Sequence, residues 1–266
     1  MAITTLDGII AGALAPRYFF KALSGTLVAG RPYTPWYVAG IPGAGTAPAS
    51  GLNGSNLTSP TNGQIPFTNP GSGNSYLARF SGDATQTGML MLVDRLWQNV
   101  LSPTTTTAQS ITQPTLPARD AAGSTNGDGV LVGLEIVTAT GAGVPTPSIS
   151  YTNQSGTASR TASLAVAYTA TSPAGTFYPF ALQAGDTGVR SIQSYTASVS
   201  MTSGAVSLVA YRILATIDLG TFAANALGPI DLGFPQIYND TVPQLIFIPS
   251  TTTTSILAGT VTFAQG

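Results

Sequence analysis

The residues of this chain that come closest to a site with chemistry lie near its middle, in the segment STNGDGVLVGLE. Polar residues and a glycine occupy positions 1, 3, 5, 6 and 12 of a calcium-binding loop, and the first of them departs from the usual pattern: Ser124, Asn126, Asp128, Gly129 and Glu135. A calcium loop needs a helix on each side, whereas QPTLPARD precedes this one and a run typical of a β-strand begins at Val130. Asn-Gly and Asp-Gly are also common in tight turns. The context favours a turn, with Glu135 placed to pair with an arginine or to cap an interface.

Other candidate chemistry is sparse. The segment GIPGAG, residues 40–45, is glycine-rich, but no Lys-Ser or Lys-Thr follows it and no helix begins there, so it lacks the features of a phosphate-binding loop. The chain has no His, no Cys, one Lys and one Glu, so a hydrolytic serine has no imidazole base. We expect no cofactor, no metal and no enzymatic activity. The catalytic alternative that stays open is a carboxylate pair brought together from distant positions.

The composition predicts an assembly. Charged residues make up 7% of the 266 residues, against about 25% in an ordinary soluble domain, whereas 43% are hydrophobic. No apolar run reaches the roughly 18 residues of a membrane span, so we expect no membrane partner. A nearly uncharged surface is best tolerated when other subunits cover it. We therefore expect a homo-oligomer, most simply a trimer.

The charge pattern also bears on partners and compartment. A net charge of −1 and nine scattered basic residues do not provide the basic patch that nucleic-acid binding needs. The absence of Cys suits a reducing compartment. The N-terminal segment carries Asp7 before its first base, Arg17, which is the reverse of a secretory signal. We expect synthesis in the cytoplasm and no export by that route.

The first half of the chain, residues 1–118, is expected to hold one or two short helices and a long extended arm. Thr4 or Thr5 would cap a helix that runs to Leu14, before Pro16. A second helix is predicted over residues 84–101, because apolar residues recur there at helical spacing: Met89, Leu92, Val93, Leu96, Trp97 and Val100. Between the two helices, residues 25–80 are rich in Gly, Pro, Asn, Ser and Thr, which is typical of an extended arm.

The second half, residues 119–266, is expected to be an antiparallel β domain. Short β-branched segments separated by Gly and Pro predict eight strands, over residues 130–138, 147–152, 161–169, 176–183, 189–201, 205–219, 244–249 and 255–263. The strand over 205–219 is apolar on both faces apart from Arg212 and a few hydroxyls, which places it at the centre of a sheet. No helix intervenes between these strands, so the pattern predicts a mainly β fold, a β-sandwich or jelly-roll-like domain.

The segment WYVAGIPGAGTAPASGLNG, which begins at Trp36, allows two interpretations. In the first, it is an arm that lies on a neighbouring subunit and is anchored by Arg31, Tyr33, Trp36 and Tyr37, since aromatic residues and Arg dominate interface energies. In the second, residues 33–38 form a strand of the chain's own core. The first interpretation predicts that deleting Gly43–Pro70 leaves the domain after residue 118 folded.

Several segments resemble structural proteins that are encoded beside the major capsid protein in tailed-phage genomes. They are RYFFKAL, GRPYTPWYVAGIPG, STNGDGVLVGLE with SYTNQSGTASRT, FALQAGDTGVRSIQSY and FPQIYNDTVPQLIFIP. The resemblance implies a bacteriophage virion protein of the decoration or cement type, which binds the major capsid protein on the outside of the shell. Such proteins commonly have compact β domains and extended arms and are often trimeric. No residue of known role in that family can be matched to this chain.

Two alternative functions stay open. The chain could be another virion component, such as a tail, fibre or capsid subunit, which would use the same subunit contacts. A β-sandwich adhesin or carbohydrate-binding module would favour an export signal and exposed aromatic residues on a β face. A fibre would favour internal repeats, and no period persists along the chain.

The calcium alternative leads to the first prediction. If Asp128 and Glu135 belong to a turn, adding a calcium chelator to the purified protein should leave its melting temperature unchanged, because no bound ion is lost by mass action. Differential scanning calorimetry with and without the chelator measures this. A fall in melting temperature that added calcium reverses would contradict the turn.

Overall fold

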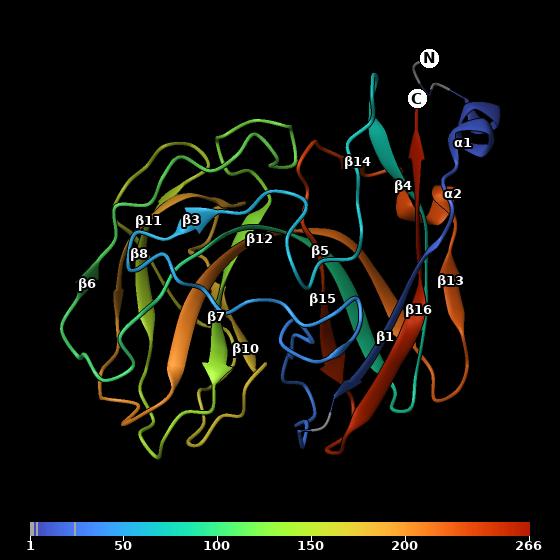
Figure 1. Ribbon diagram of the computed structural model, residues 1–266. Coiled ribbons are helices and arrows are strands. Elements are labelled where there is room, and N and C mark those ends of the chain that lie inside the picture. Colours follow the sequence, from blue (N-terminus) through green and yellow to red (C-terminus); the bar gives the residue numbers. More distant parts are fainter. Residues whose placement is uncertain (1–2, 4, 24) are drawn as a thin grey trace. The chain divides into compact units, whose positions relative to one another are not determined.

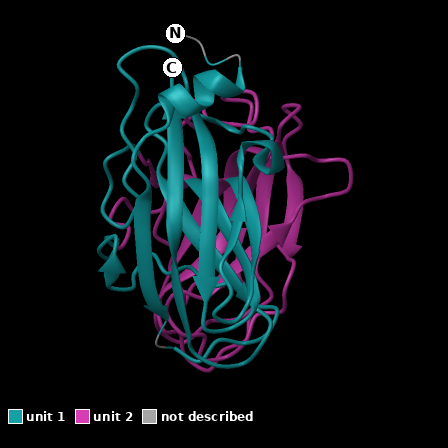
Figure 2. Cartoon of the chain, turned by 90° about the vertical axis from the view of Figure 1, so that its right-hand side faces the viewer, with its two compact units in different colours: residues 1–46, 58–94, 213–266 teal, residues 47–57, 95–212 magenta. Residues whose placement is uncertain are grey.

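The computed structural model describes residues 3, 5–23 and 25–266, which fall into two compact units (Figure 2). Unit 1 comprises residues 1–46, 58–94 and 213–266, and unit 2 comprises residues 47–57 and 95–212. The boundaries at 94/95 and 212/213 fall inside strands β5 (Gly88–Gln98) and β12 (Ala205–Leu219). Residue 118, where composition divides the chain, lies inside the unbroken segment 95–212 of unit 2.

Unit 1 is built on a six-stranded antiparallel sheet in the order β13-β4-β16-β1-β2, with β14 also paired to β4 (Figure 1). Its elements are α1 (Leu6–Gly12), β1 (Arg17–Leu23), β2 (Gly40–Ile41), β4 (Ser75–Ala84), β13 (Asn225–Leu227), α2 (Pro229–Leu232), β14 (Gln236–Ile237), β15 (Pro243–Pro249) and β16 (Ser255–Gln265). One core joins side chains of this sheet, such as Phe19 and Phe80, to those of β15 and the adjacent parts of β5 and β12, such as Phe247, Leu90 and Leu214. Unit 1 is therefore a β-sandwich.

Unit 2 is also antiparallel. It contains β3 (Ser55–Asn56), β6 (Gln109–Ser110), β7 (Val130–Thr138), β8 (Ser148–Asn153), β9 (Arg160–Leu164), β10 (Phe177–Ala181), β11 (Val189–Thr196) and the remaining parts of β5 and β12. The strands follow the order β5-β12-β7-β10-β9-β8-β11-β6, and β3 pairs with β5. A second core of aliphatic and tyrosine side chains, including Leu134, Tyr151 and Tyr195, lies within this unit.

The predicted mainly β, antiparallel fold is confirmed. Strands β7 and β12 have the predicted bounds, and β12 lies between β5 and β7, as its two apolar faces indicated. The short N-terminal helix is also confirmed: the Thr5 hydroxyl accepts the Gly8 N–H at 3.1 Å and caps α1, while Thr4 lies outside the described residues. The helix ends at Gly12, two residues before the predicted Leu14.

The helix predicted over residues 84–101 is wrong. Strand β4 ends at Ala84, and β5 runs from Gly88 to Gln98, paired with β15 in unit 1 through Leu92 and Leu245. Residues 90–97 are all buried, so the apolar positions form a continuous run and not one face of a helix. Periodicity cannot distinguish a strand buried on both faces from a buried helix, which is why the spacing misled.

The extended arm predicted over residues 25–80 is also wrong, because its parts are built into both units. In unit 2, the Trp97 indole donates to the Asn53 carbonyl at 3.1 Å and the Arg119 guanidinium donates to the Leu57 carbonyl at 2.9 Å. In unit 1, the Phe67 ring packs edge-on against Phe263, with ring centroids 5.2 Å apart. Deleting Gly43–Pro70 would remove these contacts, so we no longer expect residues 119–266 to fold without that segment.

A buried ion pair lies at the centre of unit 2. The Arg95 guanidinium donates to both carboxylate oxygens of Glu135, at 2.8 and 2.7 Å, and neither side chain is accessible to solvent. Arg95 Nε donates in addition to Gln98 Oε1 at 2.9 Å. Of the two roles expected for Glu135, the pair with an arginine is confirmed, and its carboxylate lies in the core.

The ion pair leads to the second prediction. Glu135→Leu should destabilise the protein by about 3–5 kcal/mol, because it leaves the Arg95 charge buried without its counter-ion. Chemical denaturation measures the change, with the exposed Arg190→Leu as a control that should cost little. The double variant Arg95→Met/Glu135→Leu should recover much of the loss. A loss as large in the double variant as in the single one would contradict this account.

Candidate assembly surface

The structure assigns the calcium-like segment to a turn organised by a neighbouring residue, Asp120. Its buried carboxylate accepts the N–H groups of Ala122, Ser124, Gly127 and Asp128, at 2.7 to 3.2 Å, and the Ser124 hydroxyl at 2.7 Å. Burial alone would raise the pKa of Asp120, but the hydrogen bonds, above all those from Ser124, outweigh it and hold the pKa below its ordinary value. Sequence reasoning missed Asp120, although an Asp just before a Gly- and Ser-rich turn is a known signal.

The remaining calcium-loop positions face other partners. Asp128 accepts the Thr187 hydroxyl at 2.6 Å, and Glu135 is held by Arg95. Across the part of the chain that the structure describes, no group of three His, Cys, Asp or Glu side chains is placed to hold a metal ion. The turn of residues 120–129 is thus closed by the protein's own side chains.

Two of the four predicted partner anchors are core residues. Tyr33 and Trp36 are 3% and 2% exposed, and the Tyr33 backbone exchanges two hydrogen bonds with Phe247, at 2.8 and 2.7 Å. The prediction that they anchor the chain on another subunit is therefore wrong for Tyr33 and Trp36, which belong to the chain's own core as the alternative expected. The strand that this alternative predicted over residues 33–38 does not form, since Tyr33 makes only an isolated bridge to Phe247. Arg31 and Tyr37 are half-buried, and their role toward a partner stays a prediction.

The glycine-rich segment 40–45 is held by the chain's single lysine. Lys21 Nζ donates to the carbonyls of Val38 at 2.7 Å and Gly43 at 3.2 Å. Burial lowers the pKa of Lys21 to about 8. Gly40 pairs with β1 so closely that a Cβ atom there would lie 2.2 Å from the Phe20 carbonyl oxygen. The Lys21 ammonium thus meets one carbonyl of this segment, that of Gly43, and one just before it, that of Val38, whereas a phosphate cradle presents backbone N–H groups to an anion.

The distribution of charge is the unusual feature of the surface. Of the 19 charged residues, seven are buried: Lys21, Asp94, Arg95, Arg119, Asp120, Glu135 and Arg212. Among the described residues, five charged residues are exposed: Asp7, Arg79, Arg190, Asp218 and Asp231. The rest are partly covered. The surface consequently has far fewer ionic groups than an isolated soluble domain of this size normally presents.

Exposed apolar side chains gather in unit 1. Nine large hydrophobic residues are exposed there, namely Leu6, Ile10, Tyr18, Phe20, Ile41, Ile213, Phe222, Ile230 and Ile256, against three in unit 2, namely Leu52, Val144 and Val199. In β1 the exposed Tyr18 and Phe20 alternate with the buried Phe19 and Lys21. Phe20 lies directly opposite Ile41 of β2, so the outer face of the sheet carries an apolar pair where a polar one is usual.

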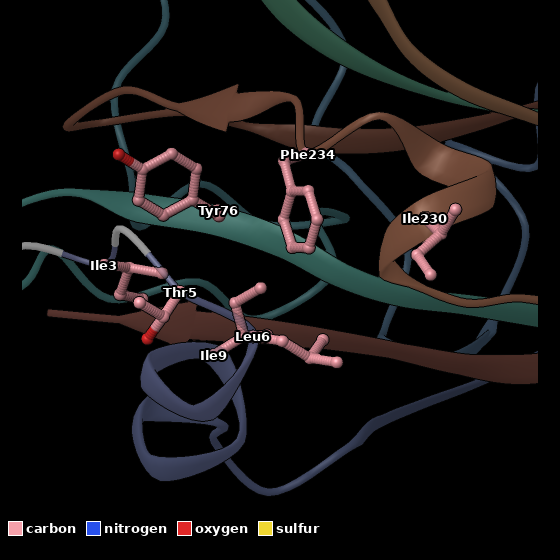
Figure 3. A pocket seen from close by; sticks show the side chains of 7 residues that line it. All are labelled: Ile3, Thr5, Leu6, Ile9, Tyr76, Ile230 and Phe234. Atoms are coloured by element: carbon pink, nitrogen blue, oxygen red, sulfur yellow. The ribbon is translucent and has the colours of Figure 1, made fainter.

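The two short helices add a groove to unit 1, which we call the α1–α2 groove. Ile9 of α1 is buried against Ala78 of β4 and Ala264 of β16, while Leu6 and Ile10 are exposed. Figure 3 shows that α1 and α2 contribute side chains to one hollow, of about 390 Å³, lined by Ile3, Thr5, Leu6, Ile9, Tyr76, Ile230 and Phe234. Its lining is almost wholly apolar.

A second hollow adjoins the first, since Ile9 lines both. It has a volume of about 570 Å³ and is lined by Ile9, Ile10, Ala13, Leu14, Pro16, Ala78, Arg79, Pro229, Thr260 and Thr262. α1 can lie this close to β16 because Gly12 has no side chain: a Cβ atom there would be 2.4 Å from the Gln265 carbonyl oxygen. α2 begins with Pro229 and ends at Leu232, and its C-cap Gly233 has the left-handed φ of 66°.

Comparisons with known proteins give no family. No family model matches the chain, and no curated protein matches it. Among solved structures, an infectious bursal disease virus VP2 subviral particle aligns with 96% of this chain and 81% of its own, at 11% identity and a TM-score of 0.20. T=1 particles derived from the same virus align with 96% and 79%, at 11% identity and a TM-score of 0.18. At such TM-scores the alignments carry no argument about this chain.

No helix in the described part of the chain is both long enough and apolar enough to cross a membrane.

The burial of Trp36 leads to the third prediction. Trp36→Ala should lower the free energy of unfolding by about 3–5 kcal/mol, because it removes a large side chain from the core of unit 1. The half-buried neighbour Tyr37→Ala is the matched control and should cost much less. Thermal or urea denaturation measures both. Equal and small effects would restore Trp36 as a candidate partner anchor.

Proposed function

We propose that this chain is a structural component of a virus particle, a phage decoration or cement protein that binds the outside of the capsid through contacts between subunits. The observation that carries the proposal is the surface of unit 1, where nine described large hydrophobic residues are exposed against four charged ones. Exposed apolar side chains that gather into a patch, as Phe20 and Ile41 do, mark sites of association. In this proposal the chain acts by binding and not by catalysis.

The kind of assembly comes from the sequence resemblance to structural proteins encoded beside the major capsid protein of tailed phages. A protein that is always bound in a shell does not need a charged surface to stay soluble in isolation. The ion pair of Arg95 and Glu135 and the Asp120 carboxylate are consistent with this, because these charged groups are buried and stabilise the fold instead of lying on the surface.

The fourth prediction tests the function directly. Purified protein added to particles produced without it should bind saturably and co-sediment with the shell, and gold-labelled antibody should mark the capsid surface in negative-stain images. Particles that already carry the protein are the control and should take up little more. Label confined to the tail would favour the alternative of a tail or fibre component. Absence of label and of co-sedimentation would overturn the proposal.

A further inference from the structure

We propose that the α1–α2 groove is a self-association site, in which a second copy of this chain docks the same groove about a two-fold axis, so that the homo-oligomer is a dimer and not the trimer expected from the sequence. The inference deepens the proposed function, on which it rests for the reason to assemble, and it names the partner of one part of the apolar surface. Three features of the surface support it: the charges around the groove, the exposed side chains beside its hollows, and the way in which a two-fold axis would set these parts against each other.

Charges surround the groove although they are scarce elsewhere. Three of the five exposed charged residues flank it: Asp7, Arg79 and Asp231. Asp7 follows Leu6 in α1 and Asp231 follows Ile230 in α2, so both acidic residues are chain neighbours of residues that line the first hollow, while Arg79 lines the second. Asp231 accepts the Gly228 N–H at 3.0 Å, and none of the three forms an ion pair within the described chain. An apolar centre with a polar rim is the usual anatomy of a protein interface.

The signs of these charges identify the partner. The two acidic residues neighbour the lining of the first hollow and the basic residue lines the second, with a net charge of −1 over the three residues. A nucleic acid or a charged membrane would require charges of a single sign. A surface that carries both signs on opposite sides is complementary to a copy of itself turned by 180°. The second copy is therefore the occupant that the charges favour.

Protruding and hollow parts occur side by side on this surface. Ile10 and Ile230 are 68% and 81% exposed, which places them among the most exposed large hydrophobic residues of the chain. Ile230 also lines the first hollow, of about 390 Å³, and Ile10 lines the second, of about 570 Å³. An engineered cavity of about 150 Å³ accepts benzene, so each hollow has room for an aliphatic side chain of a partner. In a two-fold pair, Ile10 and Ile230 of each copy enter the hollows of the other.

The two-fold arrangement follows from the order of these features. The two hollows share one lining residue, Ile9, and their other lining residues differ. A two-fold axis near Ile9 sets the first hollow of one copy against the second hollow of the other. Asp7 and Asp231 of each copy then face Arg79 of the other, and two such contacts form in every pair.

The fifth prediction reverses the charges. Arg79→Glu alone, and Asp7→Lys/Asp231→Lys together, should each weaken self-association at least tenfold, because like charges then meet across the pair. An equimolar mixture of the two variants should regain association as a heterodimer, since each contact is again between opposite charges. Sedimentation equilibrium of the purified proteins measures this, with Arg190→Glu as a control that changes an exposed arginine of unit 2. Recovery on mixing also shows that both variants are folded.

A second pair of variants tests the apolar contact. Ile10→Ser/Ile230→Ser should weaken the dimer at least tenfold, whereas Phe222→Ser should not, although Phe222 is 76% exposed in the same unit. The inference is overturned if the unmodified protein stays monomeric up to about 100 μM, a concentration at which a dimer of only ~10 μM dissociation constant would predominate. A trimer in place of the dimer, or no recovery on mixing, also overturns it.

The two proposals fail separately. A protein that binds particles but remains monomeric in solution would retain the proposed function and lose the two-fold site. A protein that dimerises through the α1–α2 groove but does not bind particles would retain the site and lose the virion function.

Discussion

The structure depends on one constraint, which is how a chain with 19 charged residues in 266 distributes them. Seven are buried. Lys21, Asp94, Arg119 and Asp120 form hydrogen bonds with backbone groups, and Arg95 and Glu135 bind each other. Arg95 and Glu135 form a bidentate pair with no access to solvent, where the low dielectric strengthens their attraction and raises the cost of losing either partner. Of the twelve charged residues that are not buried, seven are half-buried and five are exposed.

The same use of charge explains how long segments without periodicity become ordered. The Asp120 carboxylate accepts N–H groups of the turn that follows it, and the Lys21 ammonium donates to the carbonyls of Val38 and Gly43. Asp94 similarly accepts the Val242 N–H at 3.0 Å in unit 1. Irregular backbone has polar groups that a ladder does not satisfy, and a buried ionic side chain can satisfy several at once. The irregular segments after Asp120 and around Lys21 are therefore held in place by hydrogen bonds to buried charged side chains.

The consequence for function lies on the outside of unit 1. A strand such as β1, with apolar residues on both faces, is stable in a sandwich only at the cost of exposing one of those faces. The α1–α2 groove adds exposed aliphatic side chains, and three of the five exposed charges lie around it. The surface thus has few charges and one apolar groove with charged residues near it. This arrangement supports the assembly role proposed for the chain.

The sequence by itself determined the mainly β, antiparallel class, a cap of α1 at Thr4 or Thr5, and the bounds of β7 and β12, because β-branched alternation and capping act over short distances. For Glu135 it left two roles open, a pair with an arginine or a cap of an interface, and the structure shows the pair. Tertiary structure alone decided that residues 88–98 form a strand, since burial on both faces removes the periodicity that separates strand from helix. It likewise decided that Trp36 belongs to the core and that α1 and α2 form a groove, because both depend on contacts between segments far apart in the chain.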